Sequence, residues 1–336
     1  MAEHRIVVPG VVGSTPITHP TLSNMSANDK YRLGLDIGAS SVKYGFGSCQ
    51  QGLQHFSKKE LTHKTLDCLR ETVAAILAEC ASEPGRENIL AIGIGTPGTI
   101  DLASGKIAGV NPNLPFWSDR KPSELIPPDW AVPVVYDNDA NLMCLGEAWL
   151  RGAKGLTVGI TVGSGIGCGF VVDGKVFHGA HGWAMELGHV TSVPDGESCS
   201  CGRKGCLEAY ASVDGIRHRM LRDQEIPATS KDLSGLSGIL DLRQKYQPVA
   251  KIIDEGMQIL AMGIANLAVL VDPDRIVIGG GAMEGGLYNW MALKSLIETM
   301  LPSLNRAKTA LEEARAGNRA GVLGAIVLAS QIPDLQ

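Results

Sequence analysis

The sequence predicts an α/β protein built from two similar lobes with a cleft between them. Its 336 residues exceed the roughly 250–300 residues at which a single hydrophobic core usually stops growing. Each half also opens with the same pattern, an apolar strand, a glycine turn and a returning strand, at 35–38 and at 162–165. We therefore expect a first lobe at 31–136 and a second lobe at 137–318, after a flexible tail at 1–30.

The first half contains strand and helix patterns in alternating order. Apolar residues recur with the spacing of a strand or of an amphipathic helix, and glycine or polar residues separate the runs. These patterns predict strands at 31–36, 41–47, 53–58, 89–95 and 132–136, and a helix at 64–80. Asp137 and Asn138 then form a natural N-terminal cap, which predicts a helix ending near Leu150.

The second half repeats this order. Strand patterns occur at 157–162 and 167–172, and a long apolar helix is expected at 250–271, where Asp272-Pro273-Asp274 breaks it. A last strand at 275–278 runs into three consecutive glycines at 279–281. This order of elements favours two lobes of the same kind.

Composition and charge exclude several classes of protein. The net charge of -5, with no dense basic block, argues against a nucleic-acid or anionic-membrane partner. The N-terminal segment lacks the apolar run of a signal peptide. The longest apolar run, 259–271, is too short to cross a bilayer, which needs about 20 residues. We therefore expect a cytoplasmic protein whose scattered cysteines are reduced core residues.

Three glycine clusters are candidate phosphate- and nucleotide-binding elements. They contain Asp36, Gly38, Ser40 and Lys43 in the first hairpin, Gly163, Ser164 and Gly165 in the second, and Gly280 and Gly281 after the last strand. Glycines let backbone amides approach phosphate oxygens, and a carboxylate beside them can hold the magnesium of a nucleotide. A Walker-type loop is absent. The first hairpin, taken alone, is equally compatible with an ordinary β-turn that carries a solvated acid.

Asp139 is the candidate catalytic base. It lies at the start of the helix that follows strand 132–136. Phosphoryl transfer needs an acceptor hydroxyl held in line and a carboxylate to accept its proton. We expect the helix start to keep Asp139 ionised. The alternative is that Asp137 and Asp139 only cap and solvate the helix.

The strongest local pattern is a candidate zinc knuckle. Its four candidate ligands are His189, Cys199, Cys201 and Cys206. One histidine and three thiolates form a closed tetrahedral zinc site, and a closed site predicts a structural metal. Glu186 and Glu208 flank the knuckle, where they would accept hydrogen bonds from sugar hydroxyls, although isolated glutamates are more often surface charges.

Five motifs together resemble the ROK family of sugar kinases and repressors, a branch of the actin-like, ribonuclease H-like ATPases. They are Gly95-Thr-Pro-Gly-Thr-Ile-Asp101, Asn111-Pro-Asn113-Leu-Pro, Asp137-Asn-Asp-Ala-Asn141, Glu186-Leu-Gly-His189, and the cysteine knuckle followed by Glu208. The resemblance runs from about 32 to 329. It implies a two-lobed actin-like fold with a cleft, a closing helix at 319–331 that packs on the first lobe, and a homodimer.

The resemblance also implies a role for each site residue. Asp139 would be the base in ATP-dependent phosphorylation of a hexose, with Mg²⁺ and a structural zinc. The residues lining the sugar would be Asn113, Asn138, Asp139, Glu186, His189 and Glu208. His189 would bind zinc through one ring nitrogen and a sugar hydroxyl through the other. The sequence departs from the family pattern at Ala39-Ser40, where Gly-Thr is usual, and at Trp183-Ala184-Met185, where many relatives have Gly-Ala-Gly.

Glucose is the expected hexose, because 95–98 and 113–115 resemble the glucokinase branch. N-acetylmannosamine is the alternative, because the knuckle and 206–212 also resemble that branch. A non-catalytic sugar-sensing protein would not need Asp139 and both phosphate hairpins. A repressor is disfavoured because only about thirty residues precede Tyr31, and they contain no helix pair. Polyphosphate-dependent relatives tend to lack the knuckle, which favours ATP.

Overall fold

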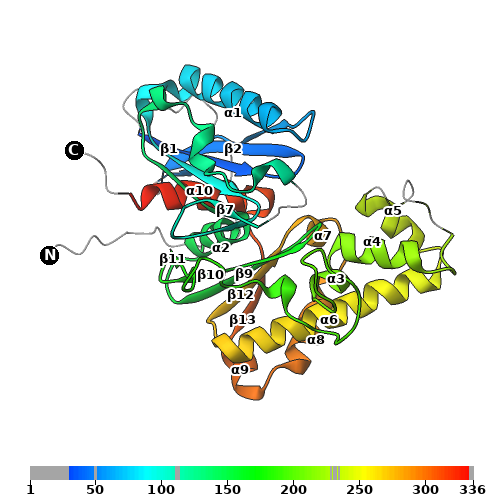
Figure 1. The fold of residues 1–336 in the computed structure, drawn as a ribbon. Coiled ribbons are helices and arrows are strands. Elements are labelled where there is room, and N and C mark those ends of the chain that lie inside the picture. The colour runs from blue at the N-terminus through cyan, green and yellow to red at the C-terminus, as the bar shows by residue number, and fades with distance from the viewer. Residues whose placement is uncertain are drawn as a thin grey trace.

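The computed structural model describes residues 30–48, 51–109, 114–227, 229, 233 and 235–332. The predicted tail at 1–30, apart from Lys30, and the predicted sugar-binding Asn113 therefore lie outside the described residues. Figure 1 shows two α/β lobes, with the helices α2 (Asp139–Trp149) and α10 (Ala320–Ser330) between their sheets.

The first lobe contains a sheet in the order β3-β2-β1-β5-β8, with β4 also paired to β2. The strands β1 (Tyr31–Ile37) and β2 (Ser41–Ser48) form an antiparallel hairpin. The strands β5 (Ile89–Thr96) and β8 (Val134–Asn138) continue the sheet in parallel with β1. The helix α1 (Leu66–Cys80) packs its apolar side chains on one face, and α10 packs on the other.

The prediction of one continuous strand at 53–58 is wrong, because residues 54–56 belong to no strand. The structure instead has two short strands, β3 (Gly52–Leu53) and β4 (Ser57–Glu60), which both pair with β2. The backbone N–H groups of Gln54 and His55 both donate to the carbonyl of Phe46. One extra residue on one strand is a β-bulge, which interrupts the ladder, and apolar alternation does not reveal it.

The second lobe repeats the topology of the first. Its sheet has the order β11-β10-β9-β12-β13. The strands β9 (Leu156–Val162) and β10 (Ile166–Val172) form the antiparallel hairpin. The strands β12 (Arg275–Gly279) and β13 (Ala310–Glu313) then run parallel to β9, and β11 (Lys175–Val176) pairs with β10. The matching order of strands confirms two lobes of the same kind.

The long helix α6 (Gln247–Val271) belongs to the core of the second lobe. It packs with α8 (Trp290–Met300), and its buried side chains join those of β9 and β12 in one apolar cluster. The helix has 25 residues, so the short apolar run at 259–271 underestimates its length. Among the described residues, α6 is the helix that is long and apolar enough to cross a membrane. However, 56% of its most apolar window is buried inside the fold.

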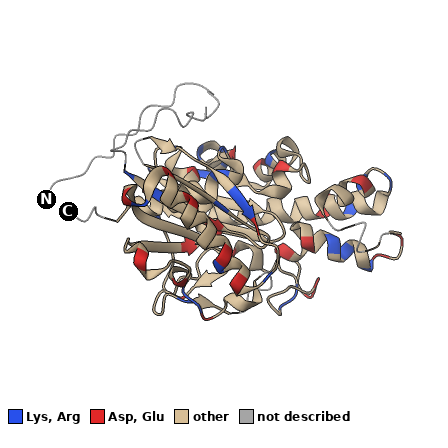
Figure 2. Ribbon diagram, turned by 90° about the horizontal axis from the view of Figure 1, so that it is seen from above, with Lys and Arg blue, Asp and Glu red and all other residues tan. Residues whose placement is uncertain are grey.

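The remaining elements are short and surround these layers. They are β6 (Thr99–Ile100), β7 (Ile107–Ala108), α3 (Glu208–Ala211), α4 (Val213–Arg222), α5 (Leu236–Arg243), α7 (Gly281–Glu284), α9 (Ser303–Lys308), and the 3₁₀ turns at 86–88, 115–117, 122–125, 128–130, 187–189 and 317–319, with one π turn at 81–85. Acidic and basic residues are interspersed along the chain in the view of Figure 2.

Glycines allow the two central helices to approach each other and the sheets. A Cβ atom at Gly324 of α10 would lie 1.8 Å from the carbonyl oxygen of Leu142 in α2, and one at Gly146 would lie 2.5 Å from that of Ala320. On the sheet side, a Cβ atom at Gly93 would lie 2.0 Å from the carbonyl oxygen of Ala325. No side chain fits at these separations, so the stack of layers depends on these positions.

A buried ion pair fixes the other end of α2. Glu147 is fully buried, pairs with Arg151, and accepts the backbone N–H groups of Arg315 at 3.0 Å and Ala316 at 2.7 Å. Arg151 also donates to Glu312 at 2.8 Å. These contacts hold the segment that leads into α10 against α2, so a buried charge is fully partnered here.

We predict that Gly324→Ala lowers the free energy of unfolding by about 1–3 kcal/mol or more, the range for overpacking. The new methyl group would overlap a backbone oxygen, which can only be relieved by separating α2 from α10. Urea unfolding measures the loss. Gly235→Ala is the matched control, because the nearest atom to its Cβ would be 4.0 Å away. Equal stability of the two variants would contradict the proposed close contact.

Candidate active site

A cavity of about 840 Å³ lies between the lobes and takes its lining from both. From the predicted site its lining includes Asp36, Gly38, Lys43, Asn138, Asp139, Gly163, Ser164, Gly165, Glu186, His189, Glu208, Gly280 and Gly281. The predicted Ser40 is exposed on the first hairpin turn and is not part of this lining. The fold thus brings together residues from both halves of the chain in one space.

Asp36 and Lys43 face each other across the first hairpin. They are paired in register on β1 and β2, and the Lys43 ammonium lies 3.3 Å from the Asp36 carboxylate. Burial raises the pKa of Asp36, although Lys43 acts in the opposite sense. A Cβ atom at Gly321 would lie 2.8 Å from this carboxylate, so the first turn of α10 closes directly over it.

Asp139 is the first residue of α2 and lines the same part of the cavity. Its carboxylate accepts the backbone N–H of Ala140 at 2.9 Å. Burial and the nearby carboxylate of Asp36 raise the pKa of Asp139 to about 7. The expectation that the helix start keeps it fully ionised is therefore wrong, because burial and a like charge outweigh the helix terminus.

Asn138 has a structural role beside its predicted contact with the sugar. Its side-chain oxygen caps α2 by accepting the N–H groups of Ala140 at 2.9 Å and Asn141 at 3.3 Å. Its amide nitrogen donates to the carbonyl of Gly98 at 3.1 Å. An amide nitrogen carries two hydrogens, so one N–H remains for a ligand.

The glycines of the second lobe leave open space in the cavity. A Cβ atom at Gly163 or at Gly281 would meet no atom within 4 Å. Gly280 differs, because its φ is 99° and its Cβ atom would lie 2.5 Å from the carbonyl oxygen of Val162. Gly280 is therefore required by the backbone, whereas the open space at the other two suits the approach of a phosphate or a base.

The two predicted sugar-binding acids differ in their surroundings. Glu186 is exposed, and its Oε1 accepts the hydroxyl of Thr99 from the opposite lobe at 3.1 Å. Glu208 is the first residue of α3 and accepts the N–H of Ile166 in the second hairpin at 2.8 Å. A Cβ atom at Gly165 would lie 2.5 Å from the same carboxylate oxygen. Glu208 thus connects the knuckle to the candidate phosphate hairpin.

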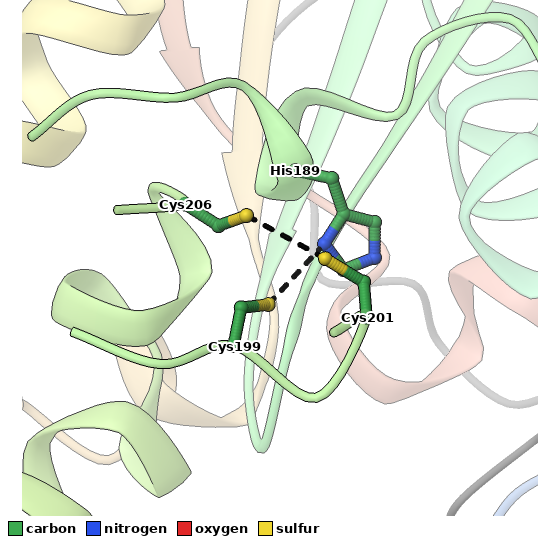
Figure 3. Close-up of side chains that lie close together, drawn as sticks. All are labelled: His189, Cys199, Cys201 and Cys206. Atoms are coloured by element: carbon green, nitrogen blue, oxygen red, sulfur yellow. Dashed lines mark hydrogen bonds between the residues drawn. The ribbon is translucent and has the colours of Figure 1, made fainter. Parts of the chain in front are cut away.

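The four predicted metal ligands converge on one point (Figure 3). One ligand atom from each of His189, Cys199, Cys201 and Cys206 lies within 4.8 Å of all the others. The nearest pairs are His189 Nδ1 to Cys199 Sγ and Cys201 Sγ to Cys206 Sγ, both at 3.6 Å. Zinc–sulfur bonds of about 2.3 Å in a tetrahedron place sulfurs roughly 3.8 Å apart, so the donor set and its spacing fit zinc.

Local hydrogen bonds favour a thiolate at Cys201, whereas burial raises the pKa of Cys199 and Cys206. Burial acts to raise the pKa of Cys201, but hydrogen bonds from the Arg203 backbone and the neighbouring thiols outweigh it and lower the value to about 7. Because Nδ1 of His189 faces the sulfurs, its Nε2 is the ring nitrogen available for a ligand. His189 also lines the cavity.

Sequence reasoning missed a hydrogen-bonded pair beside the candidate base. Asp137 is buried, and its carboxylate lies 2.6 Å from Nε2 of His178. This hydrogen bond raises the pKa of His178. The two residues are far apart in the chain, so no local spacing indicates that they meet.

Comparison with known proteins identifies the family. The model of the ROK family matches residues 32–332. A glucokinase from Halalkalibacterium halodurans is 31% identical over 323 residues, which covers 88% of this chain and 94% of that protein.

Two solved structures have the same two-lobed actin-like fold. A ROK hexokinase from Thermus thermophilus has a TM-score of 0.73 and 29% identity, covering 89% of this chain and 97% of its own. A ROK family glucokinase from Streptomyces griseus, solved with glucose and AMPPNP, has a TM-score of 0.73 and 26% identity, covering 90% and 100%. The family model, the related sequence and the fold agree: this chain belongs to the ROK family.

Proposed function

We propose that this protein transfers the γ-phosphoryl group of ATP to a hydroxyl of glucose, giving glucose 6-phosphate and ADP. The observation that carries this proposal is the position of Asp139, a carboxylate at a helix start in the cavity that two glycine hairpins, Glu186 and Glu208 also line. Similarity to a glucokinase and to a glucokinase structure with glucose and AMPPNP supports it.

Asp139 acts as the general base. As the hydroxyl oxygen bonds to the γ-phosphorus, the bond from phosphorus to the β,γ-bridging oxygen breaks, and the hydroxyl proton passes to the Asp139 carboxylate. A base whose pKa is near the working pH suits this transfer. The hairpin glycines place backbone N–H groups near the phosphates, and Glu186, His189 and Glu208 hold the sugar hydroxyls in line.

Asp36 is the residue that would hold Mg²⁺, with Lys43 beside it. The fit rests on the chemistry of the donors, because Asp36 and Asp139 line one cavity and carboxylate oxygens suit this cation. When bound with ATP, Mg²⁺ neutralises charge on the phosphate oxygens.

The knuckle holds a structural zinc in this proposal. Its four ligands leave no open position for a substrate, and the metal orients Glu186, three residues before His189, and Glu208, two residues after Cys206.

Two further parts of the proposal are a homodimer and a cytoplasmic location. N-acetylmannosamine is the second candidate substrate.

We predict the highest kcat/KM for glucose when ADP release is measured over glucose, mannose, N-acetylglucosamine and N-acetylmannosamine.

Asp139→Asn should reduce kcat by about 10²–10⁴, the range for general acid–base catalysis, with little change in sugar affinity. Near wild-type kcat in this variant would remove Asp139 from the mechanism. Sugar binding without ADP release for any hexose would favour a sugar-sensing protein.

The pKa of Asp139 predicts two pH dependences. Activity requires the carboxylate, so kcat/KM for glucose should fall as the pH decreases below about 7. The phosphate groups of ATP also titrate near pH 6 and could alter the activity profile. The pH dependence of protein stability, measured by unfolding without ATP, is therefore the control. The folded-state pKa lies above the ordinary value of 3.8, so the wild type should lose stability relative to Asp139→Asn as pH rises from about 4 to about 7. A pH-independent difference in stability would contradict the raised pKa.

We predict that elemental analysis finds one zinc per chain in protein purified without added metal. Cys201→Ser should lower zinc content and stability, because metal binding adds to folding free energy, and should raise the KM for glucose more than the KM for ATP. Cys68→Ser, in α1 of the first lobe, is the control and should keep its zinc. Wild-type protein without zinc would refute the metal assignment, and a metal-free variant with unchanged sugar KM would show that the knuckle does not shape the pocket.

A further inference from the structure

The segment 177–186 of the second lobe is attached to the first lobe at three points. His178 Nε2 lies 2.6 Å from the carboxylate of Asp137, which lies in β8 of the first lobe's sheet. The carbonyl of His181 accepts the N–H of Leu102 at 3.3 Å. Glu186, at the end of the segment, accepts the hydroxyl of Thr99 at 3.1 Å. The segment therefore bridges the cleft and ends in a sugar-binding acid.

Asp137 connects the first of these contacts to the base. Its Oδ1 accepts the backbone N–H of Asn138 at 2.7 Å and the side-chain amide of Asn141 at 2.8 Å. Its Oδ2 accepts the hydrogen bond from His178, and the side chain is only 6% exposed. Loss of His178 would leave a buried charge half-satisfied at the residue that precedes Asn138 and Asp139, and such a charge is costly.

His178 must act through another residue. Neither His178 nor Asp137 lines the cavity, so neither is placed to touch sugar or nucleotide. Nε2 faces a carboxylate, so it carries the hydrogen and donates. The charged group that faces the ring is Asp137, which also dominates its electrostatics. One short hydrogen bond therefore joins the segment that carries Glu186 to the turn that carries Asn138 and Asp139.

We propose that His178 is a positioning residue for phosphoryl transfer, which holds the turn carrying the base and the segment carrying Glu186 in one geometry through its hydrogen bond to Asp137. This inference rests on the proposed roles of Asp139 as base and of Glu186 in sugar binding. Small misplacements of reacting groups cost up to about 10²-fold in rate, so a lost contact at this point should be measurable in turnover.

The test compares His178→Leu with His178→Gln. Leucine fills a similar volume without a donor, whereas the glutamine amide can still donate to Asp137. We expect His178→Leu to reduce kcat about 10–100-fold and to raise the KM for glucose, with the KM for ATP nearly unchanged. His178→Gln should restore most of both losses. His181→Leu is the matched control, because His181 lies in the same segment with its ring against Trp183, and it should behave as wild type.

Three outcomes of this test count against the positioning role. Wild-type kinetics for His178→Leu, equal losses in both His178 variants, or a parallel rise in the KM for ATP would each overturn the proposal. Should His178→Leu fail to fold, Asp137→Asn removes the charge while keeping one acceptor, and it must show the same kcat and sugar-KM losses, smaller in size. Failure of the proposed function is seen separately, because the wild type itself would then release no ADP with any hexose, whereas failure of this inference leaves wild-type activity and the loss in Asp139→Asn unchanged.

Discussion

The close contact between α2 and α10 is the constraint on which the rest of the structure depends. Each helix packs on one sheet, so the distance between the helices sets the distance between the lobes and the width of the cavity. Gly146 and Gly324 bring backbone against backbone at the contact. The ion pair of Glu147 with Arg151 anchors the segment that leads into α10. The chain is therefore held against α2 both before α10, at Arg315, and within it, at Gly324.

The same contact places chemistry at two helix starts. Asp139 opens α2, and Gly321 in the first turn of α10 lies against Asp36. A helix terminus is worth about 0.3–1 kcal/mol at an exposed site, which lowers a carboxyl pKa by less than a full unit. Burial and the second carboxylate raise the pKa of Asp139 from 3.8 to about 7. Burial and the neighbouring carboxylate therefore outweigh the helix dipole in setting the pKa of Asp139.

Local patterns predicted the parts of this protein that depend on local chemistry. The two hairpins and the cysteine knuckle were found because their residues are close in sequence and their turns need glycine. The interrupted edge strand at 52–60 was missed because a bulge depends on one shared acceptor, the carbonyl of Phe46. The role of Glu147 was missed because two of its partners, the N–H groups of Arg315 and Ala316, come from a distant segment, and that of His178 because Asp137 is also distant in the chain. An isolated acid or histidine has no periodicity that indicates burial or pairing, so contacts between lobes require the folded chain.

Glu208 connects the proposed sugar-binding part of the cavity to the proposed nucleotide-binding part. It begins α3 just after the last cysteine of the knuckle, and one carboxylate oxygen accepts the N–H of Ile166 at the turn of the second hairpin. Gly165 lies against that oxygen, where a Cβ atom would be 2.5 Å away. The knuckle is therefore connected through Glu208, the proposed sugar-binding acid, to the hairpin. One oxygen of Glu208 accepts a hydrogen bond from the hairpin, so its other oxygen can accept one from a sugar hydroxyl. We therefore expect that a sugar which shifts Glu208 also shifts the hairpin loop that is proposed to hold the phosphates.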